Sequence, residues 1–324
     1  MTSAVTVVVP TRNRRRLLAT TLDAILGQEG ADVEVVVVDE ASSDDTEEYL
    51  HSLGEERVRV IRHDPPKLLP GARNAGIAAA RTEWVAFCDD DDLWAPTKLA
   101  AQQERLAAVS GSAWSCTGCV YVDDDLVVRG GHRAPSSGDV HREVLANNVI
   151  PGGGSTVVAR TALVQRLGGF RSLPASEDWD MWIRLAGAAP LAAVDAPLVA
   201  YRVHQSSHSH DVGLMERADA QLADDHADAR ARLGVEPEWV EKQRYYGRLE
   251  VRNRDRVAAA RRFATIARRS RARGDALGAL LALASPRLLD RVWLRTMARH
   301  LDPEWIRTAD QWLDPVRRGT GPTG

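Results

Sequence analysis

The amino-acid sequence predicts an α/β fold with a mainly parallel sheet, and two observations carry this prediction. First, short continuous runs of apolar residues alternate with helical patterns through the first hundred residues. Such runs are typical of strands that are buried on both faces by the helices that connect them. Second, polar residues follow the ends of several runs, where ligands bind in open α/β sheets. A helical C-terminal extension is predicted to follow this sheet.

Each element has its own sequence signal. Strands are predicted at residues 5–9, 33–38, 58–61 and 84–88, where Val, Ile and aromatic residues predominate. A helix is predicted over residues 14–26, because its apolar side chains recur on one face: Leu17, Leu18, Leu22, Ile25 and Leu26. Small residues predict a further helix over 73–80, a strand-like stretch covers 113–122, and a later helix is expected around 179–186.

The length of 324 residues suits one large domain and a smaller one. We expect the first domain over residues 1–210, a helical region over 211–316 and a disordered tail over 317–324. Hydrophobic content of 44% and charged content of 27% are ordinary for a soluble globular protein. The net charge of -3 gives no reason to expect a nucleic acid as partner.

Three cysteines are too few for a disulfide framework, which favours a reducing, cytoplasmic location. Cys116 and Cys119 have CxxC spacing, but they lie in the strand-like stretch, so a structural role is expected. The chain starts almost directly on a strand, and we expect no signal peptide. The longest apolar run, residues 276–284, is too short to cross a bilayer. The inner face of the membrane is an alternative location.

Four consecutive aspartates, Asp89 to Asp92, follow the apolar run at residues 84–88. Adjacent carboxylates repel one another unless a cation lies among them, and oxygen ligands suit Mg²⁺ or Mn²⁺. The motif therefore predicts a site for a metal ion and a diphosphate at the end of a strand. An acidic run can also be a solvated loop, and the motif alone does not decide between these interpretations.

Four other polar segments lie at the ends of predicted elements, so a common sheet edge would gather them: Pro10–Asn13, Asp39–Asp45, Gly71–Gly76 and Ser176–Asp180. The ordered set resembles the inverting glycosyltransferases of family 2, which have the GT-A fold. The matching stretches read VVVPTRNRRRLLATTLDAILGQ, VEVVVVDEASSDDT, PGARNAGIAAARTEWVAFCDDDDLW and GGFRSLPASEDWDMWIRL. The resemblance covers about residues 4–208.

The resemblance implies a metal-dependent enzyme that moves a sugar, with inversion, from a nucleotide-sugar donor to an acceptor hydroxyl. A uridine diphosphate sugar is the expected donor, with Mg²⁺ or Mn²⁺ as cofactor. Pro10, Thr11 and Arg12 correspond to the segment that holds the base and ribose, largely through backbone groups. Asp39 corresponds to the carboxylate that accepts the base N–H, which a uracil imide can donate. Alternatively, Asp39 is a helix-capping residue.

The remaining donor-site roles also come from the resemblance. Arg73 corresponds to the basic residue that faces the nucleotide. Asp91 corresponds to the direct metal ligand, whereas Asp89 and Asp90 would address the ribose and metal-bound water. His204 corresponds to an additional metal or diphosphate contact, although a lone histidine is more often a surface or core residue. Asp92 is expected to be structural.

The acceptor side is predicted at the start of the helix around 179–186. Asp178 corresponds to the base that removes the acceptor proton, and Glu177 to a group that contacts acceptor or sugar. Trp179 and Trp182 have helical spacing, which favours core packing over stacking on a sugar. The segment Pro151–Ser155 would either present backbone N–H groups to the donor sugar or form an ordinary loop.

The acceptor remains open among glycans, lipid-linked molecules and small molecules. The Arg-rich C-terminal helices would contact anionic lipid, or they form a hairpin packed on the first domain or on a second subunit. Two other functions compete with glycosyl transfer. A sugar-nucleotide nucleotidyltransferase would share the acidic site, but the first strand leads to Pro-Thr-Arg-Asn instead of a Gly-rich phosphate loop. A non-catalytic nucleotide-sugar binder would not need the Glu177–Asp178 pair.

Overall fold

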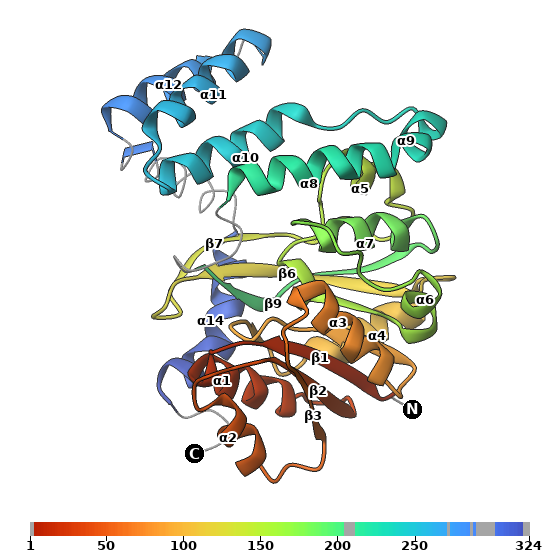
Figure 1. Cartoon of the computed structure of the whole chain (residues 1–324). Coiled ribbons are helices and arrows are strands. Elements are labelled where there is room, and N and C mark those ends of the chain that lie inside the picture. The colour runs from red at the N-terminus through yellow and green to blue at the C-terminus, as the bar shows by residue number, and fades with distance from the viewer. Residues whose placement is uncertain (1–2, 204–210, 271–272, 286–287, 290–301, 320–324) are drawn as a thin grey trace. The chain divides into compact units, whose positions relative to one another are not determined.

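A computed structural model describes residues 3–203, 211–270, 273–285, 288–289 and 302–319 (Figure 1). Contacts within the chain divide it into two units. The first unit contains residues 1–144, 148–204 and 302–324, and the second contains residues 145–147 and 205–301. The boundary predicted at residue 210 adjoins the segment 204–210, which lies outside the described residues, and it stays a prediction.

Four parallel strands form the N-terminal half of the sheet in the first unit. They are β1 (Val5–Thr11), β2 (Val33–Glu40), β3 (Val58–His63) and β4 (Trp84–Phe87), in the spatial order β3–β2–β1–β4 (Figure 1). Every residue of β1 is buried, and only one residue of β2 is partly exposed. Continuous apolar runs therefore became strands covered on both faces, as expected for a parallel sheet.

Helices cover the two faces of these strands because alternate side chains of a strand point in opposite directions. Val35 and Val37 of β2 belong to the same apolar cluster as Leu18, Leu22 and Ile25 of α1 (Arg15–Leu26). Val36 and Val38, on the opposite face of β2, pack with Ala72 of α3 (Leu68–Ala79). The short helix α2 (Thr46–Ser52) connects β2 to β3.

The second half of the sheet mixes strand directions. Its strands are β5 (Leu93–Trp94), β6 (Trp114–Val122), β7 (Val128–His132), β8 (Val157–Arg160) and β9 (Leu191–Arg202). The spatial order continues β4–β8–β6–β9–β5, and β7 pairs with β6. Strand β6 is parallel to β9, whereas β4–β8, β6–β8, β5–β9 and β6–β7 are antiparallel. The predicted α/β class is confirmed, and the parallel arrangement is concentrated in the first four strands.

The other helical segments of this part of the chain are α4 (Lys98–Ala108), α5 (His141–Ala146), η1 (Gly153–Thr156), α6 (Thr161–Arg166), α7 (Glu177–Ala186) and α14 (Pro303–Arg317). Helix α14 packs against the sheet. The Trp312 indole N–H donates to the Pro197 carbonyl at 3.1 Å, and Trp305 is 5% exposed beside Gly118. The predicted helical region over residues 211–316 includes most of this helix, whereas the contacts of α14 group it with the first unit.

The second unit is helical. It contains α8 (Val212–Asp225), α9 (Ala227–Leu233), α10 (Trp239–Arg252), α11 (Arg256–Ser270) and α12 (Arg273–Ala284). Phe263 and Ile266 of α11 pack with Ala282 of α12 in its core. A side chain at Gly247 would come within 2.9 Å of the Phe263 ring, so α10 approaches that ring closely. Among the described helices, none has the length and apolar character that crossing a bilayer requires.

The three cysteines are free and buried, and Cys116 and Cys119 lie inside β6. Burial raises the pKa of both thiols far above the usual value. Because the thiolate is the reactive form, these two cysteines are inert side chains of the sheet at neutral pH.

The close approach of α3 to β1 yields the first prediction. A Cβ atom at Gly76 would lie 2.2 Å from a methyl carbon of Val8, which is fully buried. We expect Gly76→Ala to destabilise the fold by about 1–3 kcal/mol, since the helix or strand must shift. Urea denaturation measures this loss. Gly274→Ala is the matched control, because a Cβ atom there would meet nothing within 4 Å. Equal losses in both variants would contradict the argument.

Candidate active site

The buried guanidinium of Arg73 joins the acidic run to the start of α7, where Glu177 lies 104 residues after Arg73 in the sequence. Its Nη2 donates to Asp89 Oδ1 at 2.8 Å, and its Nη1 donates to Glu177 Oε1 at 2.9 Å. Arg73 is only 2% exposed. Burial alone would lower its pKa, but Asp89, Glu177 and Asp178 raise the pKa above the usual value. This contact places the acidic strand end beside the start of α7, as the sequence predicts.

The position of Arg73 is fixed by an aromatic side chain below it. The guanidinium carbon lies 5.1 Å from the centre of the Phe170 ring, within cation–π range. Asn74 holds the backbone of Phe170 at both ends, since its amide donates to the Phe170 carbonyl at 2.8 Å and accepts from the Phe170 N–H at 2.7 Å. Asn74 is therefore a packing residue that orients its neighbour.

A second arginine, Arg14, neutralises the middle of the acidic run. Its Nη1 lies 3.0 Å from Asp90 Oδ1 and 2.6 Å from Asp91 Oδ2. The other Asp90 oxygen accepts from the Thr11 hydroxyl at 2.7 Å. Burial, opposed by Arg14, raises the pKa of Asp90 to about 6. Arg14 also follows directly on the Pro10–Asn13 segment, so the end of β1 reaches the end of β4.

Asp92 has a structural role, as expected. It is 1% exposed, and its two oxygens accept from the Ser155 hydroxyl and from the Arg202 backbone N–H, the latter at 3.0 Å. The Ser155 hydroxyl also accepts from the Asp89 backbone N–H at 3.0 Å. Burial raises the pKa of Asp92 well above its usual value. These bonds fix the acidic run to η1 and to the end of β9.

Asp178 lies in the first turn of α7, next to Glu177. One of its oxygens accepts from the Trp179 backbone N–H at 2.7 Å. Burial and the charge of Glu177 raise the pKa of Asp178 to about 6, while Arg73 opposes this shift. A carboxyl group with a pKa near the working pH is suited to general base catalysis, because it is ionised and still binds a proton readily.

The glycine-rich segment around η1 passes close to both motifs. A Cβ atom at Gly153 would lie 3.7 Å from Asp178 Oδ2, and one at Gly154 would lie 3.2 Å from Arg73 Nη2. Gly152 and Gly153 have positive φ angles of 63° and 55°, a conformation that favours glycine. The segment Pro151–Ser155 is therefore a wall of the site, in contact with Arg73 and near Asp178.

The two tryptophans of α7 are core residues. Trp182 is fully buried and stacks on Trp114 with 6.4 Å between ring centres. Trp179 is 5% exposed, and its indole N–H donates to the Val144 carbonyl at 2.7 Å. The structure therefore favours the packing interpretation over sugar stacking.

The predicted nucleotide side is built on the ends of β1 and β2. Pro10 and Thr11 are buried at the end of β1, and Arg12 is exposed. Asp39 is 1% exposed, accepts from the Ser42 backbone N–H at 3.0 Å and pairs with Arg62. The residue that precedes α2 is Asp45, so Asp39 is not a helix cap. A carboxylate has about four acceptor positions. The contacts with Ser42 and Arg62 orient the Asp39 carboxylate and occupy only some of these positions.

Predicted metal ligands are only partly described. His204 lies outside the described residues. Within the described part of the chain, no three His, Cys, Asp or Glu side chains come together as a metal site. The side chains of Asp91 and Asp89 are 12% and 26% exposed, and Arg14 and Arg73 respectively contact them.

The sequence predicts no site role for Arg14 or Phe170, and it indicates Ser155 only as part of the segment Pro151–Ser155. The position of Arg14 directly after a polar strand end is a signal for its role. The contacts of Ser155 and Phe170 depend on pairings across the sheet that the sequence does not encode locally.

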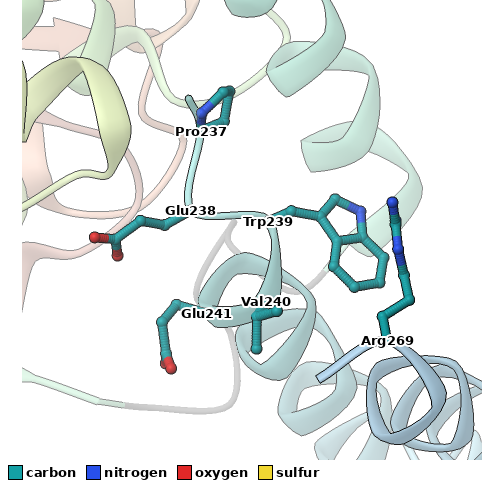
Figure 2. A pocket seen from close by; sticks show the side chains of 6 residues that line it. All are labelled: Pro237, Glu238, Trp239, Val240, Glu241 and Arg269. Atoms are coloured by element: carbon teal, nitrogen blue, oxygen red, sulfur yellow. The ribbon is translucent and has the colours of Figure 1, made fainter. Parts of the chain in front are cut away.

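A hollow in the second unit contains none of the predicted site residues (Figure 2). Its volume is about 490 Å³, and its lining consists of Pro237, Glu238, Trp239, Val240, Glu241 and Arg269. The Arg269 guanidinium lies 4.3 Å from the centre of the Trp239 ring and covers one face of the indole.

Comparison with known proteins agrees with this geometry. The model of glycosyl transferase family 2 matches residues 6–158. The succinoglycan biosynthesis protein ExoO of Rhizobium meliloti is 42% identical over 104 residues, which are 32% of this chain and 30% of that protein. The Escherichia coli protein WfaP, named as a UDP-Glc:alpha-D-GlcNAc-diphosphoundecaprenol beta-1,3-glucosyltransferase, is 25% identical over 209 residues, covering 63% of this chain and 79% of that protein.

Two solved structures share the fold. A mannosyltransferase from Pyrobaculum calidifontis, in complex with GDP-Man and Mn²⁺, has a TM-score of 0.54 and 21% identity, and the match covers 96% of this chain and 87% of the other. S. aureus TarS, in complex with UDP-GlcNAc, has a TM-score of 0.58 and 15% identity, with coverage of 98% and 92%. These similarities show the GT-A fold and support a glycosyltransferase. The match of residues 6–158 to glycosyl transferase family 2 supports the resemblance found in the sequence.

Replacing the central cation yields the second prediction. We expect Arg73→Met to cost about 3–5 kcal/mol at pH 8, because Asp89 and Glu177 lose their buried partner. Arg73 also opposes the rise in the pKa of Asp178. Loss of Arg73 therefore raises the pKa of Asp178 further. The destabilisation is present at pH values above this pKa, and it becomes smaller as Asp178 is protonated toward pH 5. Urea denaturation at both pH values measures the effect.

Arg73→Lys is the matched control, since it keeps the charge and should lose less stability. Wild-type stability of Arg73→Met at pH 8 would contradict the role assigned to this arginine.

Proposed function

We propose that the chain transfers a sugar from a nucleotide-sugar donor to an acceptor hydroxyl, with inversion at the sugar carbon. The observation that carries this proposal is the bridge from Asp89 through Arg73 to Glu177, beside Asp178. It supports a donor diphosphate site and a base at one place. An inverting transfer requires both, because the acceptor attacks on the face opposite the leaving group.

The donor class is supported by the related proteins. WfaP is named for the donor UDP-Glc, and the two similar structures hold UDP-GlcNAc or GDP-Man. We infer a uridine diphosphate sugar, with Asp39 as acceptor for the uracil N–H and Pro10, Thr11 and Arg12 beside the base and ribose. The acceptor that we favour is a lipid-linked glycan, since the names of WfaP and of a Campylobacter jejuni relative both specify undecaprenol-linked acceptors.

The acidic run fits a divalent cation that is shared with the donor. Mg²⁺ and similar ions are commonly held by one or two carboxylates together with substrate phosphates, so a cage of three protein ligands is unnecessary. Asp91 would be the protein ligand, with Asp89 and Asp90 toward metal-bound water and the ribose, and His204 as the predicted additional contact. When bound, Mn²⁺ or Mg²⁺ would stabilise the negative charge of the departing diphosphate.

The protein's own residues would perform the remaining steps. Arg73 presents a permanent positive charge beside the diphosphate site. Asp178 takes the proton of the acceptor hydroxyl, the acceptor oxygen bonds to the sugar carbon, and the bond from that carbon to the diphosphate breaks. The nucleoside diphosphate leaves with the bonding electrons. Glu177, held by Arg73, lines the space for the acceptor or the sugar.

The third prediction concerns the base. We expect Asp178→Asn to lower kcat by about 100- to 10,000-fold while the chain still binds UDP, because only the proton acceptor is lost. The transfer rate of the wild-type chain should decrease as the pH is lowered past about 6, because Asp178 becomes protonated there. The neighbours of Asp178 that influence its pKa are Glu177, Arg73 and Asp89. A radiolabelled-sugar transfer assay across pH measures both effects.

Asp125→Asn, in the turn between β6 and β7, is the matched control and should retain wild-type activity. Full transfer by Asp178→Asn would end the assignment of the base.

The fourth prediction concerns the cation. We expect UDP to bind the wild-type chain about tenfold or more tightly with Mn²⁺ than with a chelator, because the ion joins the carboxylate to the phosphates. Asp91→Asn should remove this difference. Titration calorimetry measures it, with Asp125→Asn again as the control. Equal UDP affinity with Mn²⁺ and with chelator in the wild-type chain would refute the metal role.

A further inference from the structure

Helix α12 exposes a row of leucines. Leu277, Leu280 and Leu283 are 56%, 67% and 51% exposed, and they recur at intervals of three residues. Side chains at this spacing lie along one side of a helix. Gly278 and Ala282 face the opposite way, toward Phe263 and its cluster in α11. Helix α12 is thus apolar on its packed side and on its open side, and an apolar patch of this kind marks an interaction surface.

The neighbouring helix supplies positive charge. Helices α11 and α12 lie side by side (Figure 1). Between Arg256 and Ala284 the sequence has seven arginines and a single acidic residue, Asp275. Asp275 is 5% exposed and accepts from Arg244 at 2.9 Å and 2.7 Å. Over the described residues 256–270 and 273–284, the hairpin therefore presents no exposed carboxylate.

Two exposed arginines of α11 lie on the side opposite its packed side. Arg261 and Arg268 are exposed and seven residues apart, so they share one side of the helix. Phe263 and Ile266 on the other side are buried in the core of the unit. Arg262 is less available to a partner than the exposed Arg261 and Arg268, because it pairs with Glu250 and Glu216.

We propose that the α11–α12 hairpin docks on the surface of an anionic lipid bilayer. The leucine row would enter the boundary of the acyl chains, and the arginines would meet lipid phosphates, since their long side chains reach the headgroup level. Helix α12 has 12 residues and is about 18 Å long, which is too short to span a bilayer. It therefore lies along the interface.

Charge decides between a bilayer and a second copy of the chain. A symmetric dimer through this hairpin would bring the same arginine-rich surface from both copies together. Like charges would then face one another, with no exposed carboxylate of the described hairpin to pair with them. An anionic bilayer supplies the missing negative charge.

Co-sedimentation of the full chain with lipid vesicles tests this proposal. We expect binding to vesicles of equal parts phosphatidylglycerol and phosphatidylcholine, and much weaker binding to phosphatidylcholine alone. The triple variant Leu277→Ser, Leu280→Ser, Leu283→Ser should bind about tenfold more weakly for each leucine. Arg261→Gln with Arg268→Gln should weaken binding about fivefold for each arginine, with a smaller effect at high salt.

The matched control is Val60→Ser with Val127→Ser, at positions 42% and 41% exposed in the first unit, and it should bind as the wild-type chain does. No binding to anionic vesicles, or undiminished binding by the triple variant, would overturn the proposal. Dimerisation that the triple variant abolishes, without vesicle binding, would overturn it as well.

The docking proposal does not rest on the proposed transfer reaction. Each variant is therefore also tested for UDP binding by thermal shift. A normal UDP response with lost vesicle binding supports the docking surface and shows an intact donor site. Vesicle binding by a wild-type chain that does not bind UDP would contradict the proposed function, whereas it would support the docking surface.

Discussion

The architecture of the site depends on the ion pairs of the Arg73 guanidinium. A buried charge is strongly destabilising unless it is paired, and here the two partners come from the end of β4 and the start of α7. The ring of Phe170 and the backbone of Gly154 close in on the same group. The same two ion pairs therefore join the end of β4 to the start of α7 and assemble the proposed site, because losing either partner would leave a buried charge poorly paired.

The balance of charge around this group explains its chemistry. Five carboxyl groups, on Asp89, Asp90, Asp91, Glu177 and Asp178, are contacted or influenced by two arginines, Arg14 and Arg73. Negative charge is in excess, and burial adds to its cost. Burial is the main cause of the raised pKa values of Asp90 and Asp178, and the neighbouring carboxylates of Asp91 and Glu177 add to the shifts. Carboxyl groups with strongly perturbed pKa values are typical of functional sites.

Much of this arrangement was predictable from the sequence because it follows from period and position. Continuous valine runs predicted β1 and β2, and polar residues after strand ends predicted a shared edge. Arg73, Asp89, Glu177 and Asp178 lie in polar segments that position alone identified, whereas their individual roles came from the family resemblance. The structure brings the four residues together. The mixed direction of the later strands was not predictable, since antiparallel and parallel partners of β6 carry the same apolar pattern. Arg14 was missed because a helical pattern hid its second role at the strand end.

The return of α14 to the first unit has a consequence for the covalent design of the chain. The helical unit is an insertion, entered after the last strand of the sheet and left before α14. Trp305 and Trp312 contact β6 and β9 only because the polypeptide returns to the first unit after the helical unit. Shortening the protein after β9 would therefore remove the tryptophans that cover this part of the sheet.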